Sequence, residues 1–488
     1  MAIITVEQYE ESLRKLKPVF YIDGEKMEGS VLDNPHFRTN LNIFRNQYRL
    51  TQSSDPKERA RFVTYSDLVD EEVSFWTSVP QSSEDLQMIV KNIHDYTSKY
   101  FCIDCMCKAL DLIWAASYDC DKDKGTKYHE NVKRFFTKVQ KNDERFVMGV
   151  MDAKGDRTLK PSQQPDPDMF VRVIEKNDKG IVVRGCKSQV SGAACAHYVI
   201  CIPGTVKAEG EENYAVAFAV PVDAKGLKFV VRPAAGPLQP KEYNNPMSSE
   251  VGVVECVAVF DDVFIPWEDV FLCGEWEYTR NYITYLSSFI RTLKGTCTAA
   301  RIDMMSGFAQ LMADANGIAN ATHIRNKLTD MAISANNGYS AGLAAAVDST
   351  KHPSGLQIPN IVLANSGLYV DRLDMISYFG TLMEIGGGAV TTMPLEKNYV
   401  SEAIGEDMHK YMKGKAGTAD DYRYRALSLV QDITASMFTG YFMSSIICAG
   451  GTPETNRVEV YRNHDFARPL EVAKACAKLD GKNIWNQD

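Results

Sequence analysis

The sequence of 488 residues lacks an apolar run long enough to cross a membrane, and it lacks an excess of basic residues. Its least polar long segment, 435–451, is shorter than the ~20 residues that a spanning helix needs and carries several hydroxyl groups. The net charge is −9 with no basic stripe, so we expect no nucleic-acid partner. The first residues lack the charged region and apolar core of a signal peptide. We therefore expect a cytoplasmic protein without a membrane segment.

Several catalytic motifs are absent as well. The chain contains no Gly-x-Ser-x-Gly, no Walker loop and no His-Glu-x-x-His, so hydrolase and nucleotidase functions have no support. It contains no internal repeat. There are twelve cysteines, which in a cytoplasmic protein are expected to be thiols or metal ligands rather than disulfides.

The pattern of apolar residues changes twice along the chain, which predicts three parts. Residues 1–145 are expected to form a mainly helical domain, with caps at Thr5 and Ser82 and a long helix from about 86 to about 118. Residues 146–275 read as short strands punctuated by Gly and Pro, typical of a small β-barrel or sandwich. Residues 276–488 read as a helical bundle. The expected long helices of this bundle are 281–315, 324–346, 361–385 and 420–449.

The segment 148–192 lies at the start of the second part. It contains a predicted hairpin, with strands at 169–174 and 181–184 and a turn at 177–180. Ahead of the hairpin, Lys154-Gly155-Asp156-Arg157 places two cations, an acid and a flexible backbone on one turn. Such a turn can offer N–H groups and charge to a phosphate or a flavin ring. A solvated turn is the alternative interpretation.

Three cysteines lie close together at 102, 105 and 107. Thiolates suit zinc and iron–sulfur clusters. On a regular helix Cys102 and Cys105 would share a face while Cys107 would point away, so a metal would need further ligands, with Cys297 as a candidate. Buried core thiols and a redox or catalytic thiol are the other interpretations.

The chain resembles the flavoprotein family that contains 4-hydroxybutyryl-CoA dehydratase and the 4-hydroxyphenylacetate 3-hydroxylases. The matching pieces lie in order along nearly the whole chain. They are 125–126 with 128–129, 154–157, 166–168, 182–185, 263–266, Asp314 with 316–317, and 392–394. The resemblance implies an α+β, acyl-CoA dehydrogenase-like fold, bound FAD and a homotetramer.

The resemblance also places flavin-binding residues. The turn from Met151 onward would follow the isoalloxazine and ribityl chain, while Gln189 and Ser191 would lie near the ring. The glycines at 386–388 would approach the cofactor from a neighbouring subunit, although three glycines alone indicate a helix end. The cofactor-binding residues implied in this way are Met151, Lys154, Asp156, Arg157, Gln189, Ser191, Gly386 and Gly387.

The catalytic positions of both branches are altered. The cluster ligands of the dehydratase fall on Tyr100, Asp104, Ile290 and Cys297, so only Cys297 is retained and we expect no metal site of that kind. A tyrosine of the family is replaced by Lys294, and its glutamate base falls on Ser444 or Ser445. The phenol-binding Arg and Tyr of the hydroxylases fall on Cys102 and Met106, and their His falls near Met148.

The sequence is compatible with three functions. The first is a FAD enzyme that dehydrates, isomerises or dehydrogenates a small acyl-CoA-type substrate, with Cys102, Lys294 and Cys297 as candidate catalytic residues. The second is an aromatic monooxygenase that takes reduced flavin from a partner reductase. The third is a family member without activity. The altered phenol-binding positions favour the first.

Overall fold

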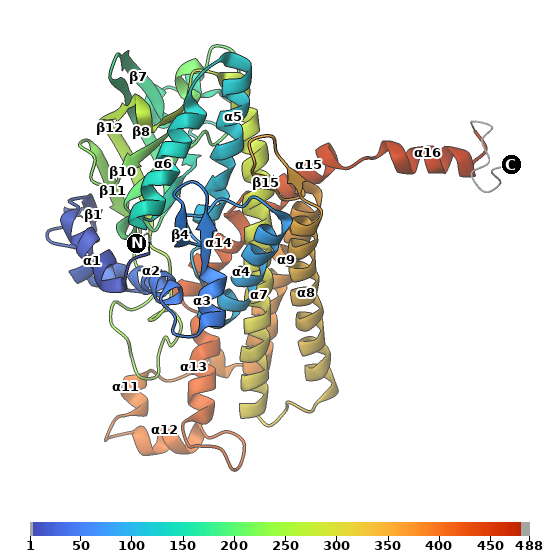
Figure 1. Cartoon of the computed structure of the whole chain (residues 1–488). Coiled ribbons are helices and arrows are strands. Elements are labelled where there is room, and N and C mark those ends of the chain that lie inside the picture. The colour runs from blue at the N-terminus through green and yellow to red at the C-terminus, as the bar shows by residue number, and fades with distance from the viewer. Residues whose placement is uncertain (1–2, 480–488) are drawn as a thin grey trace.

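The computed structural model describes residues 3–479 and divides them as the sequence predicts, into N-terminal helices, a central β region and a C-terminal bundle (Figure 1). The Thr5 and Ser82 caps are both present, each as a reciprocal pair with the residue three positions on. The N-terminal helices are α1 (Val6–Lys15), α2 (Arg38–Thr51), α3 (Pro56–Phe62), α4 (Ser83–Tyr100), α5 (Leu112–Lys124) and α6 (Tyr128–Asn142).

The central region consists of two sheets that pack face to face. One has the strand order β2-β1-β11-β12-β8-β6, with β7 paired to β8, and the other has the order β13-β10-β9-β5. Phe218 of β10 meets Phe260 of β12 at a ring-centroid distance of 5.9 Å, which joins the two layers. The strands are β1 (Val19–Ile22), β2 (Glu25–Lys26), β5 (Phe146–Gly149), β6 (Met151–Asp152), β7 (Arg172–Asn177), β8 (Gly180–Ser191), β9 (Tyr198–Cys201), β10 (Val216–Pro221), β11 (Leu227–Val231), β12 (Glu255–Pro266) and β13 (Val270–Cys273).

The predicted hairpin is confirmed as β7 and β8, which are joined by the turn that ends at Gly180. The β8 strand is longer than expected and continues to Ser191, where it still pairs with β12. Because β8 also pairs with β6, Gln189 lies opposite Met151. The two segments that the resemblance assigns to the flavin therefore lie side by side.

The C-terminal part is built on three long helices that run side by side (Figure 1). They are α7 (Thr279–Ala315), α8 (Thr322–Val347) and α9 (Ile361–Gly386), as the apolar pattern predicts. Shorter elements complete this part: β14 (Thr350–Lys351), β15 (Gln357–Ile358), α10 (Ala389–Thr392), α11 (Glu396–Tyr399), α12 (Gly405–Tyr411), α13 (Tyr422–Thr434), α14 (Met437–Cys448), α15 (Pro453–Asn463) and α16 (Ala467–Cys476).

The expected single helix over 420–449 is wrong, because the chain breaks between α13 and α14. The Ser436 side chain caps α14 and also donates to the carbonyl of Asp432. The Asp432 carboxylate in turn accepts from Ser248 and from the backbone of Met247. These tertiary bonds favour the break over a continuous apolar helix.

The expected long helix from 86 to about 118 is also interrupted. It ends at Tyr100, and Phe101 and Asp104 adopt positive φ angles of 66° and 44°. A 3₁₀ helix at Met106–Asp111 then leads into α5. The carbonyls of Ile103 and Asp104 accept bonds from the buried Gln47 amide, which replace the lost helical bonds. The cysteines at 102 and 105 therefore lie on an irregular segment, and the prediction that they share a face of a regular helix is wrong.

The last helix leaves the body of the protein. In Figure 1, α15 begins against the bundle, where its Asn456 is buried, and α16 extends sideways as an arm. Phe466, Leu470 and Val472 on this arm are exposed, at 51%, 55% and 48% respectively. Within residues 3–479 no single helix is long and apolar enough to span a membrane, although the bent pair Tyr422–Thr434 and Met437–Asn463 passes by length and composition.

Candidate active site

The candidate catalytic residues Cys102, Lys294 and Cys297 are brought together between α7 and the irregular segment 101–105. Lys294, Cys297 and Arg301 share one face of α7, because residues three and four apart are neighbours on a helix. The charges of Lys294 and Arg301 both act on Cys297, and the charge of Arg301 acts on Cys102. Lys294 also donates to Ser445 Oγ of α14 at 3.3 Å. Three segments that are far apart in the sequence therefore meet at this site.

Cys297 is 4% exposed and lies among hydrogen-bond donors and cations. The thiol of Cys105 hydrogen-bonds to it, and Arg301 and Lys294 lie nearby, so the pKa of Cys297 falls well below the usual range for a thiol. That same bond and burial raise the pKa of Cys105. Burial raises the pKa of the neighbouring Cys102 to about 11. Within the cluster the pKa of the Cys297 thiol is thus lowered, while the pKa values of Cys102 and Cys105 are raised.

Lys294 is 5% exposed, and burial lowers the pKa of its ammonium to about 8, with a further contribution from the charge of Arg301. Of the two serines that can stand at the position of the family's glutamate, Ser445 bonds to Lys294, whereas Ser444 is exposed. A charged Lys294 can hydrogen-bond to developing negative charge on a substrate oxygen.

Arg301 is 5% exposed and lies over the adjacent aromatic rings of Phe101 and Phe442, at 4.7 and 5.4 Å from their centroids. Its Nε donates to the carbonyl of Phe101 at 3.1 Å. Its Nη1 is buried and has no hydrogen-bond partner among the described residues. A buried guanidinium N–H of this kind costs free energy until an acceptor reaches it.

Glu255, at the start of β12, is a site residue that the sequence reasoning missed. Its carboxylate accepts from Ser191 Oγ at 2.6 Å and from the Gln189 side chain, and Lys294 lies close enough to stabilise its charge. Burial nevertheless raises its pKa above the usual range for a glutamate. A signal was present in the sequence, since Glu255 is the single acid in the otherwise apolar run 252–260. Arg301 and Asp104 were missed as well.

The flavin-binding candidates lie on the same side as Glu255. Gln189 and Ser191 bond to it, while Lys154 adopts a positive φ of 73° on the turn that follows β6. Burial and the nearby Arg157 lower the pKa of Lys154, and the Asp156 carboxylate closes the turn by accepting from Thr158. Arg232 Nε nearby is buried without a partner among residues 3–479. These cations, amide and hydroxyl fit the anionic and polar groups of a flavin nucleotide.

Gly386 and Gly387 end α9, as a glycine-rich helix terminus predicts. A Cβ atom at Gly386 would collide with Val390, whereas one at Gly387 would meet nothing within 4 Å. Approach of Gly387 to a cofactor held by a second subunit stays a prediction.

The described residues do not fit an iron–sulfur cluster. No group of three or more His, Cys, Asp or Glu side chains among residues 3–479 could hold a metal ion. Tyr100 and Ile290 stand at two of the four positions that the resemblance assigns to cluster ligands.

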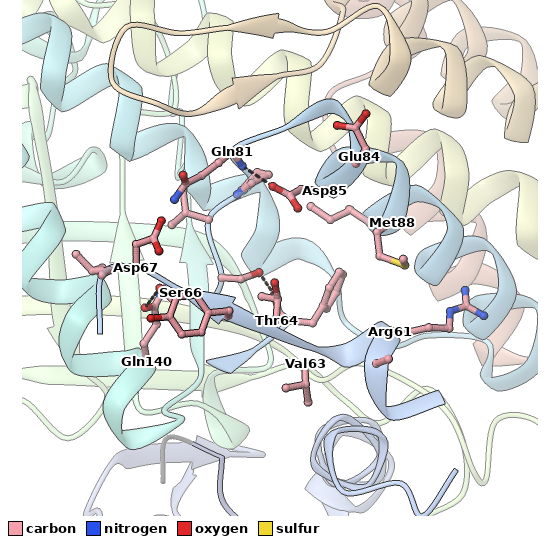
Figure 2. A pocket seen from close by; sticks show the side chains of 18 of the residues that line it. Arg61, Val63, Thr64, Ser66, Asp67, Gln81, Glu84, Asp85, Met88 and Gln140 are labelled. Atoms are coloured by element: carbon pink, nitrogen blue, oxygen red, sulfur yellow. Dashed lines mark hydrogen bonds between the residues drawn. The ribbon is translucent and has the colours of Figure 1, made fainter. Parts of the chain in front are cut away.

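A surface cavity of about 380 Å³ lies apart from this site, between α4 and the hairpin of β3 (Val63–Ser66) and β4 (Glu71–Ser74). Figure 2 shows Asp67, Glu84 and Asp85 around it. None of the candidate catalytic or flavin-binding residues lines it. Its carboxylates disfavour the phosphates of a CoA thioester or a flavin nucleotide.

Comparisons with known proteins agree with this architecture. Residues 5–272 match the model of the 4-hydroxyphenylacetate 3-hydroxylase N-terminal region, and residues 279–478 match that of its C-terminal region. The structure resembles that of an archaeal 4-hydroxybutyryl-CoA dehydratase from N. maritimus, with a TM-score of 0.92, 26% identity, and 98% of this chain and 95% of that one covered. It also resembles the FAD complex of a 4-hydroxyphenylacetate 3-monooxygenase oxygenase component, with a TM-score of 0.86, 24% identity and 98% of each chain covered. The fold is thus the acyl-CoA dehydrogenase-like fold that the sequence predicts.

Two curated relatives extend over the full chain. The 4-hydroxybutyryl-CoA dehydratase/vinylacetyl-CoA-Δ-isomerase of Clostridium aminobutyricum is 31% identical over 98% of this chain and 100% of its own length. The 4-hydroxyphenylacetate 3-monooxygenase oxygenase component of Thermus thermophilus is 27% identical over 99% of this chain and 96% of its own. The chain belongs to the 4-hydroxyphenylacetate 3-hydroxylase family, which includes both a dehydratase and monooxygenases.

Proposed function

We propose that the protein is a FAD-dependent enzyme that acts on a small acyl-CoA-type substrate by dehydration, isomerisation or dehydrogenation. The observation that carries the proposal is the convergence of the Glu255 carboxylate and the Lys294 ammonium beside Gln189 and Ser191. One relative of this chain acts on a CoA thioester, and it is 31% identical over its whole length. A FAD held by 151–158, Gln189 and Ser191 would supply electron or hydride transfer.

The residues of the site suit proton abstraction next to a thioester carbonyl. Burial raises the pKa of the Glu255 carboxyl group, which strengthens its carboxylate as a proton acceptor. Lys294 can donate a hydrogen bond to the carbonyl oxygen as it gains negative charge. The buried and aromatic surroundings of Arg301, Phe101 and Phe442 exclude water from the site.

Monooxygenation is the second candidate, because other relatives are phenol monooxygenases. Their phenol-binding positions are replaced here by Cys102 and Met106, which offer a phenolate no cation. Arg301 lies near Cys102 but already stacks on Phe101 and Phe442. No specific observation favours this function over the first.

A side-by-side substrate trial tests the proposal. The holoenzyme is incubated anaerobically with short acyl-CoA thioesters, 4-hydroxybutyryl-CoA among them, and products are analysed by mass spectrometry. A parallel series supplies phenols, reduced FAD and oxygen. We expect a change in an acyl-CoA and no hydroxylated phenol; the reverse result would replace the proposal by the monooxygenase function.

The pH dependence of kcat/KM is expected to be bell-shaped. Activity rises as Glu255 loses its proton, at a pH above the 4.5 of an ordinary glutamate because burial raises this pKa. It falls near pH 8, where Lys294 loses the charge that stabilises the substrate oxygen. Substitution Lys294→Arg should move the descending limb to higher pH, because a guanidinium stays charged there. If the descending limb of the profile stays near pH 8 in this variant, the fall in activity is not caused by deprotonation of Lys294.

We further propose that the chain forms a homotetramer. The support is the apolar arm, since exposed Phe466, Leu470 and Val472 on a projecting helix are typical of a contact with another copy. Sedimentation velocity of the full chain and of a chain that ends at His464 tests this, and an unchanged species in the shorter chain would exclude a role for the arm.

A further inference from the structure

Arg301 on α7 is a buried cation that the described residues leave partly unsatisfied. Its side chain is held in place, because Nε donates to the carbonyl of Phe101 at 3.1 Å and the guanidinium carbon lies over the rings of Phe101 and Phe442. Its Nη1 is buried as well but has no hydrogen-bond partner among residues 3–479. The rings stabilise the positive charge by cation–π interaction and supply no oxygen acceptor. An acceptor for Nη1 would therefore have to come from a ligand.

Two other buried arginines of this protein are satisfied by the chain itself. Arg145 pairs with the Asp143 carboxylate at 2.6 Å. Arg291 has no carboxylate partner, but each of its three guanidinium nitrogens donates to an oxygen atom. In contrast, no aspartate or glutamate of residues 3–479 forms an ion pair with Arg301, and no sulfur atom accepts from its Nη1. Because a buried and unpaired charge is costly, a bound anion would stabilise Arg301.

Arg301 lies along the candidate active site from Lys294. Both residues are on the same face of α7, and seven positions along a helix correspond to a rise of about 10 Å. Helix α14 follows this face, since Ser445 Oγ accepts from Lys294 at 3.3 Å while Phe442, one turn earlier in α14, lies against Arg301. A substrate whose thioester carbonyl is bound at Lys294 would therefore direct the far end of its acyl chain towards Arg301.

We propose that Arg301 binds a carboxylate at the far end of the acyl chain, so that the substrate is a short thioester of a dicarboxylic acid. A carboxylate matches a guanidinium in charge and in shape, and it would supply both the acceptor and the counter-ion that Arg301 lacks. A terminal hydroxyl group would supply only an acceptor, and a terminal methyl group neither. Because Phe101 and Phe442 already fix the guanidinium, little conformational freedom is lost on binding. This inference rests on the proposed action on acyl-CoA thioesters.

The test compares thioesters that differ only at the far end of the acyl chain. Glutaryl-CoA ends in a carboxylate and pentanoyl-CoA in a methyl group; succinyl-CoA with butyryl-CoA, and adipyl-CoA with hexanoyl-CoA, repeat the comparison for a shorter and a longer chain. Dissociation constants are measured by anaerobic isothermal titration calorimetry on the FAD-reconstituted protein. For at least one chain length we expect the carboxylate compound to bind about 30-fold more tightly or better, as for a buried charged hydrogen bond. Equal affinities within all three pairs would overturn the role of Arg301 and leave the action on acyl-CoA standing, whereas no binding of any thioester would overturn both.

Variants then assign the preference to this side chain. Arg301→Gln removes the charge and should abolish the preference for the carboxylate compound, while the affinity for its methyl-ended counterpart changes little. Arg301→Lys keeps the charge and should retain part of the preference. Arg280→Met is the control, because Arg280 is exposed at the start of the same helix, and it should leave every affinity unchanged. Circular dichroism and flavin content establish that each variant is folded. A full preference in folded Arg301→Gln would overturn the assignment, and the comparison in the unaltered protein tests the proposal even if a variant does not fold.

Discussion

Substitution Glu255→Gln is expected to lower kcat/KM for the acyl-CoA substrate by about 10²–10⁴-fold, the usual contribution of a general base. The amide has the same shape as the carboxylate and can still accept from Ser191 Oγ, so the site should keep its geometry. It cannot accept a proton from the substrate. Steady-state kinetics, together with the flavin content of the purified variant, provide the measurement. The loss should appear mainly in kcat, because the interaction is made in the transition state.

Glu175→Gln is the control for this prediction. Glu175 is exposed on β7 and its carboxylate contacts only Asn177 among the hydrogen bonds described, so its loss should leave the kinetics unchanged. If Glu255→Gln retained normal turnover with flavin bound, the base would have to be sought at Cys102, Lys294 or Cys297. If the variant lost its flavin, Glu255 would instead be needed for cofactor binding, through its bonds to Gln189 and Ser191.

Substitution Arg145→Met is expected to lower the free energy of unfolding by about 3–5 kcal/mol, because it leaves the charge of Asp143 buried without a partner. Arg145 is 2% exposed and Asp143 is fully buried, and they pair at 2.6 Å. The guanidinium also stacks 4.0 Å above the ring of Tyr48 and donates to Gln47 Oε1. Urea unfolding followed by tryptophan fluorescence measures the change.

This substitution should also disturb the geometry of the active site. The Gln47 amide that Arg145 holds is the one that donates to the carbonyls of Ile103 and Asp104. Loss of Arg145 therefore loosens the segment that carries Cys102 and Cys105. Arg184→Met is the matched control, since Arg184 pairs with Asp262 at the surface and is worth at most about 1 kcal/mol. An Arg145→Met variant as stable as this control would contradict the account of the buried pair.

Much of the fold follows from local signals in the sequence. The caps at Thr5 and Ser82, the hairpin turn before Gly180 and the glycine ends of the long helices are set by neighbouring residues, and all appear in the structure. The two breaks that were missed, at 101–105 and 435–436, depend on partners far away in the chain. Gln47 satisfies the first and Ser248 contributes to the second. Apolar periodicity alone carries no information about such partners.

Residues of the candidate site were predictable only where the residue type is itself reactive or unusual at its position. Cys102, Lys294 and Cys297 were found because thiols and a lysine at altered family positions are conspicuous, and the structure brings them together. Glu255 and Arg301 were missed because an acid on a strand and an arginine on a helix are ordinary until burial shows that they face inward. The assignment of 151–157, Gln189 and Ser191 to FAD stays a prediction, supported by their position around Glu255.

The central claim is that a flavin and an acyl-CoA thioester meet at Glu255 and Lys294. The most direct test is an anaerobic absorbance titration of the FAD-reconstituted protein with the short acyl-CoA panel. The account predicts that at least one thioester perturbs or bleaches the flavin bands, and that Lys294→Gln weakens this response. Flavin bands that no acyl-CoA alters, but that a phenol does, would contradict the account.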